Sequence, residues 1–264
     1  MNKNGPIALL FNALVILFTL APILVVCVIA FTPENTLTMN GPEFSLRWFK
    51  AVFEFPDFVS SFWNSLWLAL AAATISTVLA IPAAMALVRY PHRWSGVLQG
   101  LFLSPLIIPH LVLGVALLRL FSVVGGAGSF AWLVLAHSLV VTPYTMRLIM
   151  AALIGFDRSA EQAALSLGAS RSTVFLRITL PMILPGITGG WLLAFINSFD
   201  EVTMSIFVTS PSTVTLPVRM YMYATESIDP MMAAVSALMV AITAVAMIIL
   251  DRVYGLDRVL VGRT

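Results

Sequence analysis

The chain has 264 residues, of which 60% are hydrophobic and 10% are charged, and its mean hydropathy is +0.99. This composition excludes an ordinary soluble domain, because such a domain needs far more polar residues to cover its surface. The net charge of +2 gives no indication of a nucleic-acid partner. The one cysteine, Cys27, excludes a disulfide within the chain and lies in an apolar run, where a thiol packs as a small hydrophobic group.

Six long apolar runs predict six transmembrane helices, at residues 7–31, 61–88, 96–118, 129–153, 182–208 and 231–250. Each is long enough to cross most of a hydrocarbon layer of about 30 Å at about 1.5 Å per residue. The first run exceeds the apolar region of a signal peptide, which needs only about 7–15 residues, so we expect it to be retained. Kinks are predicted at the prolines within these runs, which are Pro22, Pro82, Pro105, Pro109 and Pro143.

Basic residues predict that both termini are cytoplasmic, because cytoplasmic segments carry the excess of positive charge. Of the 14 Lys and Arg residues, only Arg47, Lys50, Arg119 and Arg219 fall on the opposite side. We therefore expect a first span with an external segment at 1–60, a five-helix core at 61–251 with a cytoplasmic loop at 155–181, and a cytoplasmic tail at 252–264. Aromatic and charged residues alternate in the external part, which predicts an interfacial segment or a surface for an external partner.

The cytoplasmic loop predicts two short helices. Asp157 or Ser159 can cap the first helix, and Ser159 with Gln162 fits a capping box. Gly168 can take the left-handed conformation that ends a helix, and Ser170 can cap the second helix. The first helix exposes small residues, which would let another surface approach closely. On spacing alone, a docking helix and a plain connector between two spans are both open.

The loop sequence QAALSLGASRSTVFLRITLP resembles the EAA loop of type I ABC importer permeases. The family pattern is E-A-A, three residues, G, nine residues, then I-x-L-P. The positions that match in register are Ala163, Ala164, Gly168, Ile178, Leu180 and Pro181. Gln162 stands where the family has its acid, and Glu161 lies one residue earlier. Residues 104–118 and 135–153 are also similar to helices of that family.

The resemblance implies an all-α, six-helix permease of the MetI-like fold, in the bacterial cytoplasmic (inner) membrane. In that family the loop docks in a cleft of a cytoplasmic ATPase. The coupling residues that this implies are Glu161, Gln162, Ala163, Ala164, Gly168, Ile178, Leu180 and Pro181. The implied partners are an ABC ATPase dimer, a second homologous permease subunit and an external substrate-binding protein. The chain has no G-x-x-x-x-G-K-[ST] phosphate loop, so we expect it not to be an enzyme.

Asp200 and Glu201 are the acids within a predicted span, and Asn197 can share a helical face with them. Ionisable groups at membrane depth usually face a pathway, although the headgroup level is the alternative here. His110 follows Pro109 and either lines the pathway or hydrogen-bonds to a neighbouring helix, and the same two readings hold for His137.

Residues 195–221 resemble the fifth-helix region of spermidine/putrescine permeases. The matching positions are Ser198, Asp200, Glu201, Ser205, Phe207, Val208, Pro211, Leu216 and Pro217. The resemblance implies a polyamine substrate, with opines or amino-acid-like compounds as alternatives. A proton-coupled secondary transporter and a scaffold without transport activity are the other functions considered. No spacing suggests a metal site, and we expect no cofactor.

Overall fold

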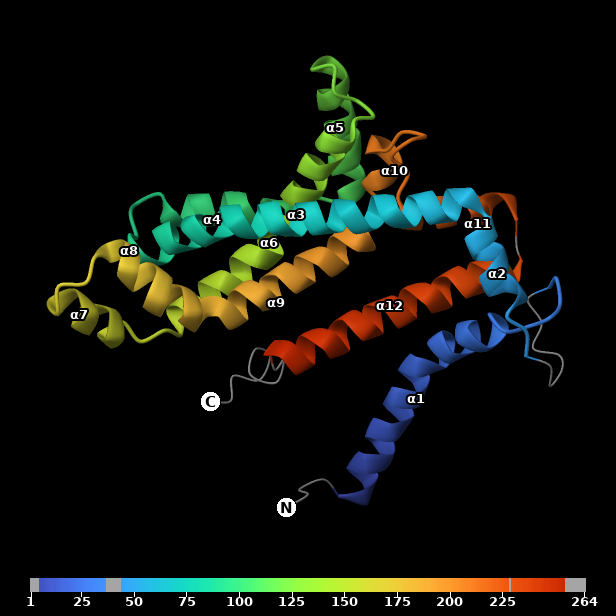
Figure 1. The fold of residues 1–264 in the computed structure, drawn as a ribbon, viewed down its shortest axis with the longest axis horizontal. Helices are drawn as coiled ribbons and strands as arrows, with labels where there is room; N and C mark the ends of the chain where they lie inside the picture. The colour runs from blue at the N-terminus through green and yellow to red at the C-terminus, as the bar shows by residue number, and fades with distance from the viewer. Residues whose placement is uncertain (1–4, 37–43, 228, 255–264) are drawn as a thin grey trace. The chain divides into compact units, whose positions relative to one another are not determined.

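Every regular element in the described residues is a helix, which confirms the predicted all-α fold there (Figure 1). The computed structural model describes residues 5–36, 44–227 and 229–254, so the predicted tail lies outside the described residues after position 254. The helices are α1 (Pro6–Ile29), α2 (Arg47–Glu54), α3 (Pro56–Arg89), α4 (Ser95–Leu103), η1 (Ser104–Leu106), α5 (His110–Val123), α6 (Phe130–Ile154), α7 (Ser159–Ser166), α8 (Arg171–Val174), η2 (Phe175–Thr179), α9 (Leu180–Phe199), α10 (Ser205–Val208), α11 (Leu216–Glu226) and α12 (Pro230–Tyr254).

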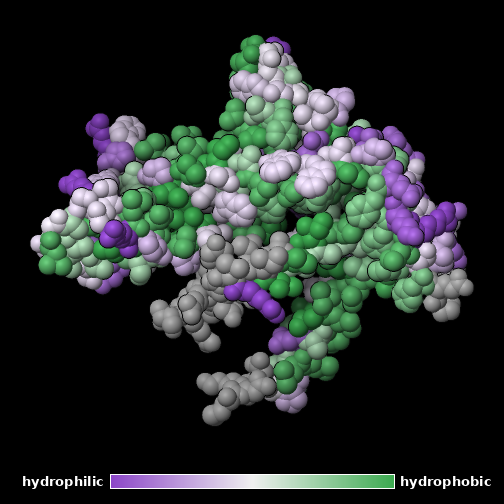
Figure 2. Space-filling model, viewed as in Figure 1, coloured by the Kyte–Doolittle hydropathy of each residue, from purple (hydrophilic) through white to green (hydrophobic). Residues whose placement is uncertain are grey.

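Four of the described helices are long and apolar enough to cross a membrane. They are α1, α3, α6 and the stretch Arg171–Phe199, in which α8, η2 and α9 are continuous. The bent pair of α4–η1 and α5 raises the number to five if it counts as one span. The sixth predicted run lies on α12, whose described apolar part, Pro230–Val245, is shorter. The surface of α1 is mostly hydrophobic, as a helix in lipid requires (Figure 2).

The chain divides into two compact units. One comprises the residues up to Ser60 together with Arg219–Ala246, and the other centres on Ser61–Val218. In the first unit, the Asp57 carboxylate lies 3.1 Å from an Arg219 guanidinium nitrogen. The second unit contains the predicted cytoplasmic loop and the predicted pathway residues, so each candidate site can be described within it. The expected divisions after residues 60 and 251 stay a prediction.

A bend of 98° separates α4–η1 from α5 and confirms the kink predicted from two prolines. Pro105 lies in the tight turn η1, and Pro109 is the residue at the N-terminal cap of α5. A proline has no backbone N–H and its ring clashes with the preceding turn, so a helix stops readily at such a pair. By contrast, Pro22, Pro82 and Pro143 lie inside continuous helices.

The prediction for the fifth span is wrong at both ends. Its helix begins at Arg171, because the π turn η2 joins α8 to α9 without a break. At the other end the helix stops at Phe199, with Asp200 as its C-terminal cap, instead of continuing to residue 208. The chain is not helical again until Ser205, where the short helix α10 starts. The apolar run therefore contains a polar interruption that hydropathy does not reveal.

Small residues let α3, α6 and α9 pack together. Ala72 of α3, Val141 of α6 and Ala194 of α9 form one buried cluster. Ser76 and Thr145 share a buried hydrogen bond of 2.8 Å between their hydroxyl oxygens, which links α3 to α6. Lipid tails are as apolar as the side chains, so such helices associate through close packing and interhelical hydrogen bonds.

The close approach of α9 to α6 at Gly186 generates a prediction. A Cβ at this position would lie 2.6 Å from Ala152 Cβ and 2.7 Å from the Leu148 carbonyl oxygen. Gly186→Ala should therefore force the helices apart and destabilise the fold by about 1–3 kcal/mol. Thermal unfolding in detergent measures this. Gly100→Ala in α4 is the control, because a Cβ there meets nothing within 4 Å. Equal transition temperatures for the two variants would contradict the prediction.

Candidate functional site

The loop predicted to be cytoplasmic has the two expected helices, α7 and α8, with a turn at Gly168. Gly168 has a φ of 87°, which confirms its predicted left-handed conformation. Its N–H donates to the Leu165 carbonyl at 3.0 Å, and the Ala169 N–H donates to the Ala164 carbonyl at 3.0 Å. This pair of hydrogen bonds is the Schellman motif, which satisfies carbonyl groups that a helix end would otherwise leave free. The turn is therefore fixed by backbone hydrogen bonds as well as by glycine.

Side-chain hydrogen bonds of Asp157 and Ser170 hold the two helix starts in the loop. Asp157 accepts hydrogen bonds from the backbone N–H and the hydroxyl of Ser159, at 3.0 and 2.7 Å. The predicted capping box of Ser159 with Gln162 is wrong, because Ser159 is already the first helical residue and the Gln162 N–H donates to the Arg158 carbonyl. The predicted cap at Ser170 is confirmed, since its hydroxyl accepts from the Thr173 N–H at 3.2 Å.

The outer face of α7 combines small and apolar side chains. Gln162 and Ala163 are exposed, Ala164 is half-buried, and Leu167 just after the helix is 89% exposed. The remaining motif positions lie at the start of the span: Ile178 is in η2, and Leu180 and Pro181 begin α9. An apolar face beside a small-residue patch on a charged loop suits contact with another protein.

Glu161 is turned inward on α7, in an environment that the sequence does not indicate. It is 5% exposed, and one carboxylate oxygen accepts hydrogen bonds from both Arg89 at the end of α3 and Thr179 in η2. Arg89 Nη2 lies 2.5 Å from Glu161 Oε1. Sequence reasoning groups Glu161 with the outward-facing residues, because a contact across 72 positions leaves no local signal.

The surroundings of Glu161 keep its carboxyl group ionised. Burial raises the pKa, but the hydrogen bonds from Arg89 and Thr179 and the charges of Arg89 and Arg158 together outweigh it and hold the pKa below the ordinary 4.5. The stabilisation from this ion pair is thus fully present above pH 4.5 and is lost as the pH falls through the lowered pKa. At neutral pH the contact is intact.

A second polar cluster occupies the break after α9. Glu201 is buried, and its Oε2 lies 2.8 Å from Nδ1 of His110, the first residue of α5. Its Oε1 accepts a hydrogen bond of 2.7 Å from the Met204 N–H. One carboxylate therefore joins the end of α9, the approach to α10 and the start of α5. The structure thus brings together His110 and Glu201, two of the predicted pathway residues.

The polar face predicted for Asn197, Asp200 and Glu201 is not formed. The helix ends at Phe199, so Glu201 has left the helical register and turns inward. Asp200 is exposed, and the Asn197 side-chain amide donates to the Leu193 carbonyl of its own helix at 2.8 Å. Of the two neighbouring acids, only Asp200 is exposed.

His137 of α6 is fully buried beside the same break. Its Nδ1 lies 2.9 Å from the Ser198 hydroxyl, and its Nε2 lies 2.9 Å from the Ser205 hydroxyl. This confirms the alternative in which His137 hydrogen-bonds to neighbouring helices. It links α6 to the last turn of α9 and to the start of α10, so the break is fixed on both sides.

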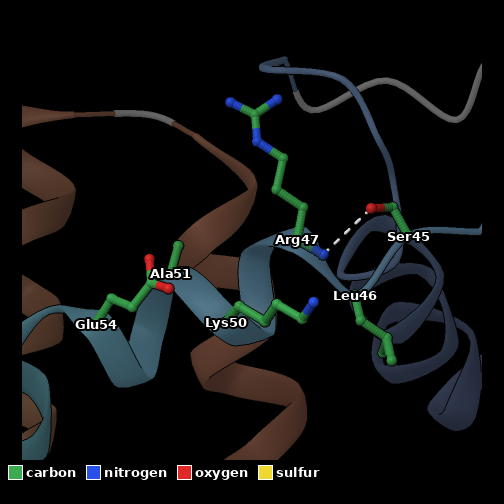
Figure 3. A pocket seen from close by; sticks show the side chains of 6 residues that line it. All are labelled: Ser45, Leu46, Arg47, Lys50, Ala51 and Glu54. Carbon is green, nitrogen blue, oxygen red and sulfur yellow. Dashed lines mark hydrogen bonds between the residues drawn. The ribbon is translucent and has the colours of Figure 1, made fainter.

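Other candidate sites are weaker. In the part of the chain that the structure describes, no three His, Cys, Asp or Glu side chains lie close enough to hold a metal ion. A surface hollow of about 450 Å³ lies beside α2 (Figure 3) and is lined by Ser45, Leu46, Arg47, Lys50, Ala51 and Glu54. The Arg47 N–H donates to the Ser45 hydroxyl there at 3.2 Å. The interfacial or partner-binding use of this segment stays a prediction.

Known proteins resemble the chain along most of its length. The family model described as binding-protein-dependent transport system inner membrane component matches residues 76–256. The spermidine/putrescine transport system permease protein PotC of Haemophilus influenzae is 32% identical over 92% of this chain and 93% of its own length. The putrescine transport system permease protein PotI of Escherichia coli K12 is 34% identical over 84% of this chain and 81% of its own. The molybdenum transport system permease protein ModB of Escherichia coli K12 is 35% identical over 60% of this chain and 78% of its own.

Solved structures share the fold. A chain of a bacterial ABC transporter involved in the import of the acidic polysaccharide alginate superposes with a TM-score of 0.71 at 14% identity, over 94% of this chain and 93% of its own. A chain of the MetNI methionine ABC transporter gives 0.62 at 19% identity, over 74% and 94%. At these identities the likeness concerns the fold alone, and it confirms the predicted MetI-like permease fold.

The different settings of the two acids predict different effects on stability. Glu201→Ala leaves the buried Met204 N–H without an acceptor and should lower the free energy of unfolding by about 1–3 kcal/mol. Asp200→Ala alters an exposed side chain and should change it by no more than about 0.5 kcal/mol. Thermal unfolding of both purified variants in detergent provides the comparison. Unchanged stability in Glu201→Ala would show that the break does not depend on Glu201, and an equal loss in Asp200→Ala would contradict the expected difference between the two acids.

Proposed function

The chain belongs to the family of binding-protein-dependent transport system inner membrane components, and on that premise we propose that it carries a polyamine such as putrescine or spermidine into the cytoplasm as one membrane subunit of an ATP-driven importer. The observation that carries the substrate class is the 32% identity to a spermidine/putrescine permease along 92% of the chain. Family membership and the apolar helices make it a multi-pass protein of the inner membrane.

Identity alone does not select the substrate, because the relative named for molybdenum transport is slightly more identical over a shorter part of the chain. The charge of the break after α9 supports a cation. Asp200 presents an exposed carboxylate next to buried Glu201, and a carboxylate attracts an ammonium group and repels an anion. A related amino compound, such as an opine or an amino-acid-like solute, is the second candidate because it also carries an ammonium group.

The partners follow from the loop. We propose that α7, with Gln162, Ala163, Ala164 and Gly168, docks on one subunit of a cytoplasmic ABC ATPase dimer. The ATP chemistry is then supplied by that dimer, since this sequence has no phosphate loop. A second homologous permease completes the membrane part, and an external binding protein delivers the substrate. In this arrangement both termini and the loop are cytoplasmic.

Substrate recognition gives a first test. Asp200→Asn removes a charge from an exposed side chain without changing its size, so uptake of labelled putrescine or spermidine should fall about tenfold at low substrate concentration. The measurement uses cells that express the complete importer, with Glu226→Gln as the control, since Glu226 is also an exposed acid. Wild-type uptake in Asp200→Asn would remove Asp200 from the pathway and withdraw the electrostatic argument for a cation.

Coupling gives a second test. A β-branched residue in the left-handed conformation of Gly168 is strained by roughly 1–2 kcal/mol, which is too little to unfold the spans but enough to redirect α7. Gly168→Val should therefore insert normally and lose substrate-stimulated ATP hydrolysis in the reconstituted complex. Ala164→Asp should do the same by placing an unpaired charge in the docking contact.

Gly155→Ala is the control for the coupling test, because Gly155 has an ordinary helical φ and its added Cβ meets only a van der Waals contact at 3.5 Å. Stimulation at the wild-type level in both loop variants would mean that the loop is only a connector. That result would favour the proton-coupled secondary transporter, since coupling to ATP hydrolysis is what distinguishes an ATP-driven importer from it.

A further inference from the structure

The strongest feature outside the proposed docking and pathway contacts is the polar cluster of Arg89, Glu161 and Thr179. We propose that Glu161 is a positioning residue that ties coupling helix α7 to the end of α3 and to the base of α9, and that it makes no contact with the ATPase. The proposal rests on the proposed function, because it assigns a role within the coupling loop of that importer.

Glu161 is held by two contacts within the chain. Both Arg89 and Thr179 donate to the same carboxylate oxygen, Oε1. The Glu161 and Arg89 side chains are only 7% and 15% exposed, and Thr179 is completely buried. A carboxylate enclosed in this way has little surface left for a second protein. Removal of one partner of a buried, hydrogen-bonded ion pair leaves the other partner desolvated and unpaired, so the contact is costly to open.

On α7, Glu161 points about 100° away from Gln162 and about 160° away from Ala163, while Ala164, about 60° from Glu161, is half-buried. Successive residues of an α-helix point about 100° apart, since there are about 3.6 residues per turn. Gln162, at the place of the family's acid, is exposed, whereas Glu161 is buried. The chain therefore has a neutral amide on the outward side and a carboxylate on the inward side. This arrangement gives the acid a different task from that of an outward-facing charge.

The cluster adds a tether that the covalent chain does not provide. Along the sequence α7 is attached to α6 at one end and to α8 at the other. The ion pair with Arg89 connects it also to α3, which lies 72 positions away. A force on α7 is then transmitted to three spans, because α3 carries Arg89 at its last residue and α9 follows directly after Thr179. Loss of the tether should leave α7 able to bind the ATPase but unable to pass on its movement.

The decisive experiment compares Glu161→Gln with the double variant Glu161→Gln/Gln162→Glu in the reconstituted importer. Two quantities are measured: the affinity for the ATPase and the substrate-stimulated rate of ATP hydrolysis. Glu161→Gln should keep the affinity within about twofold, since the docking face is unchanged, and lose stimulation by at least about tenfold, because a hydrogen bond to a charged group is lost. The double variant should behave in the same way, although it restores an acid at the family's position. Recovery of wild-type stimulation in the double variant would overturn the proposal, because the carboxylate would then be needed on the outside.

Hydrogen exchange on the isolated chain in detergent tests the tether without any partner. Exchange in residues 159–179 should be at least about tenfold faster in Glu161→Gln than in the wild type, and Arg89→Gln should add little in the Glu161→Gln background, because both remove the same contact. Unchanged exchange in Glu161→Gln would overturn the tether. Failure of the wild-type chain to bind or stimulate an ATPase would instead overturn the importer function, and the exchange result would still decide whether α7 is tied to α3.

Discussion

A chain in hydrocarbon has to satisfy each backbone N–H and C=O group within the protein, because no water is present to do so. Long helices meet this requirement along their length, and the difficulty arises where a helix stops. In this chain, polar side chains lie at the helix ends and form hydrogen bonds there. Glu201 accepts from the Met204 N–H after α9 ends, and His137 holds the serines on both sides of the same break. The places where the chain leaves helical geometry are therefore also the places where it concentrates charge and hydrogen-bonding groups.

Neighbouring residues with similar side chains have different roles in this chain. Asp200 caps the end of α9 and stays exposed, while Glu201 has already turned inward to His110. In the loop, Gln162 faces outward and Glu161 is paired with Arg89. In both pairs one step along the chain separates a side chain that can meet a partner from one that holds the framework. For Asp200 and Glu201 the end of α9 decides which is which, and for Glu161 and Gln162 the face of α7 does.

The apolar runs are sufficient to predict the helices, because a helix is the structure in which an uninterrupted apolar run of about twenty residues can cross a membrane. The turn of the loop is predictable, since Gly168 and Ser170 act locally on the backbone, but the end of the loop is not, because α8 continues through η2 into α9. The end of α9 is not predictable either, because apolar residues continue through α10 and hide the interruption at Asp200. The pairs Arg89–Glu161 and His110–Glu201 join residues 72 and 91 positions apart, and no pattern in a single sequence indicates such partners.

The π turn η2 at Phe175–Thr179 sets the angle at which the loop meets its span. A π turn closes its hydrogen bonds over five residues instead of four, so it contains one residue more than the same stretch of α-helix. Deletion of that residue would let the helix run on with regular hydrogen bonds, yet it would rotate everything before the turn by about 100° and shift it by about 1.5 Å relative to α9. The backbone would tolerate such a deletion, but α7 would no longer keep its orientation relative to α9. The number of residues in this short stretch is thus fixed by the orientation that α7 needs. Related chains should therefore accept substitutions in it more readily than insertions or deletions.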